Sequence, residues 1–99
     1  RIGAHSQIHS YSMIGHDATI GQNVCFHSDT MCASAAVIDD DVVVMPGSAI
    51  IKTGKENRHI GKGAIIHPRV TVARDVDTYE IISLAGNNTR RIYGAVVRT

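Results

Sequence analysis

Apolar residues recur at every sixth position through the first half of the chain. The series begins at Ile2 and reaches Ile50 without a break, through Ile8, Ile14, Ile20, Phe26, Cys32, Ile38 and Val44. Four residues after each member from Ile2 to Val44, a second column holds small or β-branched residues: Ser6, Ser12, Ala18, Val24, Thr30, Ala36, Val42 and Ser48. A six-residue period matches neither the 3.6-residue helix nor a long alternating strand. It predicts short strands joined by regular corners, without helices.

The six-residue period is interrupted once. After Ile50 it shifts by four residues and resumes at Ile60, and both columns then continue with Ile66, Val72, Ala64, Val70 and Val76. The additional residues lie in the segment 51–59, IKTGKENRH. Because the phase returns afterwards, we predict one loop insertion near 51–59 and not the end of the repeat.

Hexads resemble one another most when they are three apart. One set reads IGAHSQ, IGQNVC, IDDDVV and IGKGAI, and a second reads IHSYSM, FHSDTM, VMPGSA and IHPRVT. The repeat is therefore 18 residues long, which predicts three-sided coils stacked about 4.8 Å apart, with the aliphatic column inside. Glycines are expected where the backbone bends or approaches another strand, at Gly3, Gly15, Gly21 and Gly61. The whole chain, 1–99, is predicted to be one all-β domain.

This repeat resembles the left-handed parallel β-helix of the hexapeptide-repeat acyltransferases. The resemblance extends to the end of the chain, where 70–92 is similar to that family's closing segment, SVVTKDVPPYxIVAGNPAKVI. The matching residues are Val72, Asp75, Val76, Tyr79, Ile81, Ala85, Gly86, Asn87 and Ile92, whereas Asp77, Asn88 and Thr89 depart from it. The resemblance implies left-handed coils, a homotrimer and acetyl-CoA as co-substrate. No metal is expected.

The loop carries a second resemblance, to the serine acetyltransferases. Their loop, GGTGKxxGDRHP, is matched here at Thr53, Gly54, Lys55, Arg58 and His59. The segment 58–65, RHIGKGAI, is also similar to the IGKGVWIG-like hexad of sugar and xenobiotic acetyltransferases. Both resemblances imply a catalytic histidine near His59, and together they leave the acceptor open between an amino acid and a sugar.

Histidine suits this chemistry because a neutral imidazole can take the proton of an attacking hydroxyl or amine near pH 7. His59 is the first candidate for the base, and the alternative of a solvated loop residue stays open. By the family pattern the acyl group passes directly to the acceptor, so no Ser or Cys nucleophile is required. The match to the serine enzymes also suggests Arg58 as a partner for an acceptor carboxylate.

His27 is the second candidate, because FHSDT lies near the DHATG segment of the serine enzymes, displaced by one residue. Asp29 could orient its imidazole. The repeat places His9, His27, Met45 and His67 in one column, which is also consistent with packing at a subunit interface. Such a column could instead hold a metal, as in the β-helical carbonic anhydrases, although their His-x4-His pair is not matched. A non-catalytic β-helical scaffold or docking subunit is a further alternative.

Charge and cysteine content limit the kinds of partner and the cellular compartment that we expect. The net charge is +1 and no apolar stretch approaches the roughly 20 residues of a membrane helix, so neither nucleic acid nor a membrane is expected. Candidate cations for the coenzyme A phosphates lie in the second half of the chain: Lys55, Lys62, Arg74 and Arg90. The acidic run 39–41 is interpreted as a solvated turn. Cys25 and Cys32 form no metal or disulfide motif, so a cytoplasmic setting is expected.

The chain starts with Arg1 and not with Met, which suggests a C-terminal fragment of a longer protein or a processed form.

Overall fold

The computed structural model describes residues 1–52, 54–85 and 88–93. Eleven strands of two residues are followed by two of six, and none of the described residues forms a helix long and apolar enough to cross a membrane. The short strands are β1 (Gln7–Ile8), β2 (Met13–Ile14), β3 (Thr19–Ile20), β4 (Cys25–Phe26), β5 (Met31–Cys32), β6 (Val37–Ile38), β7 (Val43–Val44), β8 (Ala49–Ile50), β9 (His59–Ile60), β10 (Ile65–Ile66) and β11 (Thr71–Val72). The long strands are β12 (Glu80–Ala85) and β13 (Asn88–Tyr93).

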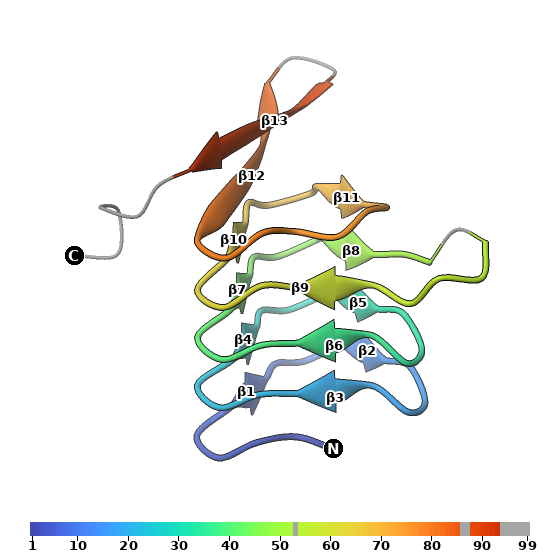
Figure 1. Cartoon of the computed structure of the whole chain (residues 1–99). Coiled ribbons are helices and arrows are strands. Elements are labelled where there is room, and N and C mark those ends of the chain that lie inside the picture. The colour runs from blue at the N-terminus through green and yellow to red at the C-terminus, as the bar shows by residue number, and fades with distance from the viewer. Residues whose placement is uncertain (53, 86–87, 94–99) are drawn as a thin grey trace.

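The short strands form three parallel sheets, one on each side of a prism (Figure 1). The β1 face contains β1, β4, β7, β10 and β12, the β2 face contains β2, β5, β8 and β11, and the β3 face contains β3, β6 and β9. Paired residues of the short strands are 18 apart, as in Ile8 with Phe26, or 22 apart across the loop, as in Val37 with His59. Ile65 of β10 pairs with Ile81 of β12, 16 residues further on. The predicted left-handed parallel β-helix of about four turns is confirmed.

Both sequence columns point into the prism. The second residue of each short strand from β3 onward is buried: Ile20, Phe26, Cys32, Ile38, Val44, Ile50, Ile60, Ile66 and Val72. So are the small residues at the corners: Ala18, Val24, Thr30, Ala36, Val42, Ser48, Ala64, Val70 and Val76. Each layer therefore contributes the same few apolar groups to one continuous core, as the six-residue period predicts.

The corners require a left-handed backbone, which the sequence columns do not reveal. Most corners contain a non-glycine residue with φ between 56° and 64°, among them Asp17, Asn23, Asp29 and Asp41. Aspartate and asparagine tolerate this region better than other side chains. At Gly61 the requirement is close approach, because a Cβ there would lie 2.5 Å from the Thr78 amide nitrogen. This confirms the predicted role for that glycine.

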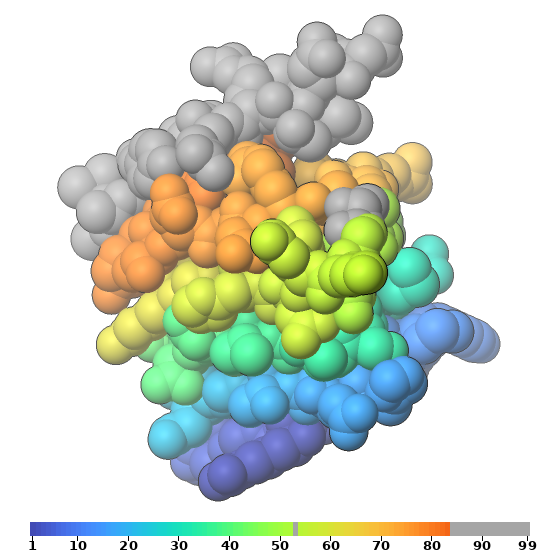
Figure 2. All heavy atoms as spheres, turned by 45° about the vertical axis from the view of Figure 1, so that its right-hand side comes forward, coloured from blue at the N-terminus to red at the C-terminus, as the bar shows by residue number. Residues whose placement is uncertain are grey.

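The insertion and the closing segment are the two departures from the regular coil. Residues 51, 52 and 54–57 lie outside the regular coil at the corner between β8 and β9, and the space-filling view shows 54–57 standing out from the wall (Figure 2). Strand β12 continues the β1 face by pairing in parallel with β10. It then pairs antiparallel with β13, so that the hairpin stands on the last coil (Figure 1).

We expect Phe26→Ala to reduce the free energy of unfolding by about 3–5 kcal/mol, because the phenyl ring is fully buried between coils that cannot close the resulting cavity. Met13→Ala on the outer surface, where the residue is 65% exposed, is the matched control and should cost less than about 1 kcal/mol. Chemical denaturation measures both. Equal losses would contradict the placement of Phe26 inside the prism.

Candidate functional site

His59 forms a side-chain pair with Asp39 on the outside of the β3 face. Because Ile60 points into the core, the alternation along β9 turns His59 outward. Asp39 follows β6 one coil below, diagonally across from His59. The Nε2 atom of His59 lies 2.8 Å from Oδ2 of Asp39, and the two side chains are 53% and 37% exposed. The pair is therefore held by the fold and remains open to a ligand.

The hydrogen bond determines which ring nitrogen can act as a base. An ionised carboxylate only accepts hydrogen bonds, so the neutral imidazole must donate from Nε2. The lone pair then resides on Nδ1, which is free to accept a proton. Asp39 also stabilises the imidazolium that results. A base with an orienting carboxylate is the arrangement used to activate a hydroxyl or amine nucleophile.

The backbone of His59 is fixed by the coil above it. Its amide donates a 3.0 Å hydrogen bond to Oδ1 of Asp75, and its carbonyl accepts one of 3.0 Å from the amide of Val76. The imidazole therefore projects from a rigid strand and not from the inserted loop that precedes it, and rigid elements hold functional groups more accurately than loops do.

Arg58 occupies a corner position that holds alanine in the coil below. Only 7% of the residue is exposed, and its Nη1 donates to the carbonyl of Ala73 at 2.8 Å. Nη2 donates to the carbonyl of Glu56 at 3.3 Å, and Nε has no protein partner. The guanidinium thus joins the loop to the next coil. Recognition of an acceptor carboxylate by Arg58 stays a prediction.

We expect Arg58→Ala to lower the free energy of unfolding by about 1–3 kcal/mol, because the Ala73 carbonyl loses a charged donor. The free energy of unfolding of Arg58→Lys should lie between those of this variant and the parent, because a lysine keeps the positive charge but lacks the planar guanidinium. Lys62→Ala, an exposed site on the following corner, serves as control with a change of about 0.5 kcal/mol or less. An Arg58→Ala protein as stable as the control would refute the anchoring role.

The second candidate base, His27, lies at a different corner, between β4 and β5. Its ring is 5.3 Å from the ring of His9, which confirms the predicted column. Within the part of the chain that the structure describes, the side chains of His27 and Asp29 form no hydrogen bond. Orientation of His27 by Asp29 therefore stays a prediction, and one chain does not bring His27 and His59 together.

The candidate cations for coenzyme A are spread over the upper half of the prism. Lys55 on the loop and Lys62 are exposed. Arg74 donates from Nη2 to Oε2 of the buried Glu80 at 3.4 Å, and it lines a pocket of about 250 Å³ with Thr71, Val72, Ala73 and Ile82. Arg90 belongs to β13, and its side chain lies outside the described residues. The pocket beside Arg74 is the feature of this region that could accept an acyl carrier.

Asp39 is the residue of this candidate site that the sequence interpretation missed, because it assigned the acidic run to a solvated turn. The sequence does contain a signal for this contact. The 18-residue repeat and the four-residue shift place position 61 above position 39, and 59 above 37. Outward side chains at 39 and 59 are then diagonal neighbours on one face, within reach of each other.

Both cysteines are free thiols with raised pKa values. Cys32 points into the core, and burial raises its pKa from 9.0 to about 11. Burial also raises the pKa of Cys25, which lies on the outside of the β1 face. A thiol must ionise before it attacks an acyl group, so these environments disfavour either cysteine as a nucleophile.

We expect iodoacetamide to modify Cys25 at least about 10-fold faster than Cys32 near pH 8, with a chelator present. A pKa of about 11 instead of 9.0 lowers the thiolate fraction of Cys32 about 100-fold at that pH, and the core excludes the reagent. Peptide mass spectrometry follows both sites. Similar rates in the unfolded chain are the control, and similar rates in the folded chain would contradict the burial of Cys32.

A family comparison agrees with this architecture. The family model described as bacterial transferase hexapeptide (six repeats) matches residues 1–34, which make up nearly the first two coils. No curated protein matches the chain significantly. The same parallel stacking continues beyond the matched segment to β11, with paired residues 18 apart between β5 and β8 and 22 apart between β8 and β11.

Proposed function

We propose that this chain, which belongs to the hexapeptide-repeat proteins, is an acyltransferase that moves an acetyl group from acetyl-CoA to a small acceptor. The acceptor is an amino acid or a sugar with a reactive hydroxyl or amine. The single observation that carries the proposal is the 2.8 Å hydrogen bond between His59 and Asp39 on an open outer face. It supplies a base and the group that orients it.

The proposed reaction is one direct transfer. Nδ1 of His59 takes the proton of the acceptor while the acceptor oxygen or nitrogen bonds to the thioester carbonyl carbon. The carbon–sulfur bond then breaks, and the imidazolium returns the proton to the departing thiolate. Asp39 stabilises the imidazolium between these two steps. Neither cysteine is required, in agreement with their raised pKa values.

Binding is assigned to residues of the loop, the upper coils and the corner of His27. Lys55, Lys62, Arg74 and Arg90 are proposed to contact the phosphates of coenzyme A, because cations form strong hydrogen bonds with phosphate. Arg58, beside His59, and Asp29, at the corner of His27, are the proposed contacts of the acceptor. His27 remains the alternative base.

The proposal also includes a homotrimer in the cytoplasm. Val37, 41% exposed beside His59 on the β3 face, supports a second copy as the other wall of the site. The exposure of the His59 ring in a single chain is consistent with such a shared site.

We expect His59→Gln to reduce kcat by about 10²–10⁴-fold, the usual effect of losing a general base, and Asp39→Asn to cause a smaller loss. Release of free thiol from acetyl-CoA, measured against a panel of amino acids, amines and sugars, gives the rates. His16→Gln is the matched control, because His16 forms an exposed pair with Asp17 at 3.2 Å on another corner and should have no effect.

Other outcomes would redirect the assignment. Loss of turnover in His27→Gln with full activity in His59→Gln would move the base to His27. If the parent protein shows neither turnover nor calorimetric binding of coenzyme A, the enzyme proposal fails and a non-catalytic scaffold is favoured.

A further inference from the structure

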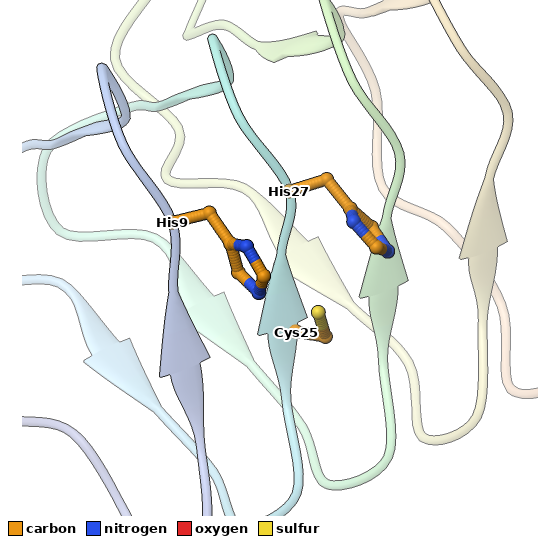
Figure 3. Close-up of side chains that lie close together, drawn as sticks. All are labelled: His9, Cys25 and His27. Atoms are coloured by element: carbon orange, nitrogen blue, oxygen red, sulfur yellow. The ribbon is translucent and has the colours of Figure 1, made fainter.

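A second group of side chains capable of chemistry lies at the corner between β4 and β5, away from His59. His9 and His27 occupy the same position in successive coils, and Cys25 projects outward from β4 two residues before His27. Figure 3 shows the thiol of Cys25 between and below the two imidazole rings. The fold therefore gathers two nitrogen ligands and one sulfur ligand from a single chain.

The distances within this group are short. One ligand atom from each of His9, Cys25 and His27 lies within 4.8 Å of the other two. The two rings are 5.3 Å apart between centroids and are tilted by 35°, so they are not stacked flat on each other. A tilt of this kind leaves room for the ring nitrogens to turn toward a common point.

We propose that His9, Cys25 and His27 bind one Zn²⁺ ion. Imidazole nitrogen and thiolate sulfur are the ligands that this borderline-soft ion prefers in proteins. Hard cations such as Mg²⁺ and Ca²⁺ select oxygen ligands, which this group lacks. Three protein ligands leave the fourth tetrahedral position open to water or to a small molecule.

The geometry requires only a small adjustment. With Zn–N bonds of about 2.0–2.1 Å and a Zn–S bond of about 2.3 Å, neighbouring ligand atoms in a tetrahedral site are about 3.3–3.6 Å apart. Because the three ligand atoms lie within 4.8 Å of one another, each distance must shorten by at most about 1.5 Å, which rotation of partly exposed side chains permits. His9 is exposed, and Cys25 and His27 are partly buried. No movement of the stacked backbone is needed.

One neighbouring side chain restrains a ligand of this group. The side-chain carbonyl of Gln7 lies 3.2 Å from Nε2 of His9 and restrains that ring beside the cluster, as outer-shell partners of metal ligands do.

The test uses the full chain, freed of any histidine tag and stripped of metal. Zn²⁺ is titrated against a chromophoric chelator, and Co²⁺ is added separately as a spectroscopic substitute. We expect about one Zn²⁺ per chain and a thiolate-to-cobalt charge-transfer band in the near ultraviolet. Cys25→Ser should abolish that band and weaken Zn²⁺ binding by about 100-fold or more, since losing only an outer-shell partner already costs 10–100-fold.

Two further variants distinguish loss of the Zn²⁺ ligands from misfolding, and neither measurement depends on acetyl transfer. His9→Gln changes an exposed side chain, so it should fold normally and still weaken Zn²⁺ binding. His67→Gln removes a histidine of the same column two coils above His27 and should leave Zn²⁺ affinity unchanged. Less than one tenth of an equivalent of Zn²⁺ per chain, or equal affinity in the Cys25→Ser, His9→Gln and parent proteins, would overturn the proposal whether or not the chain transfers acetyl groups.

Discussion

The structure depends on one constraint, the hydrogen-bonded register between successive coils. The amide of Cys25 donates to the carbonyl of Val42 and the amide of Val43 to that of Ala64, at 2.9 and 3.0 Å, and this arrangement repeats from layer to layer. A shift by one residue would turn every inward side chain outward and expose the whole core. The register therefore stacks residues of equal repeat position, and the apolar interior in turn holds the register.

Stacking also determines where chemistry can arise. Outward residues meet only neighbours from the same coil or from the coils directly above and below, so a site on one chain must be built from short vertical columns. The pair of His59 with Asp39 and the group of His9, Cys25 and His27 both follow this rule. The inserted loop changes the spacing from 18 to 22 residues at the level of the first pair but leaves the stacking unchanged.

The coil length, the inward columns and the loop could be predicted because a period is visible in the sequence itself. The His9–His27–Met45–His67 column followed from the same period. What the period cannot give is the direction of each outward side chain. Arg58 looks like a free loop cation in the sequence, yet its guanidinium is buried and donates to the carbonyl of Ala73. For Asp39 the period does indicate His59 as a diagonal neighbour, but not that the two side chains turn toward each other to form a hydrogen bond. Left-handed corner residues such as Ala35 are likewise invisible to hydrophobic periodicity.

The spacing between coils explains why the histidine column differs along its length. Adjacent layers are about 4.8 Å apart, so side chains of neighbouring coils meet directly, whereas those two layers apart, at roughly 9.6 Å, have the side chain of the intervening coil between them. His9 and His27 are adjacent, whereas Met45 separates His27 from His67. On the outer side of the β1 face, next to this column, Val43 and Ile65 occupy the position of Cys25 in the two coils above it. Neither residue offers a ligand atom. Donor chemistry is thus concentrated in the first two coils, and the upper coils present an apolar surface on the same face.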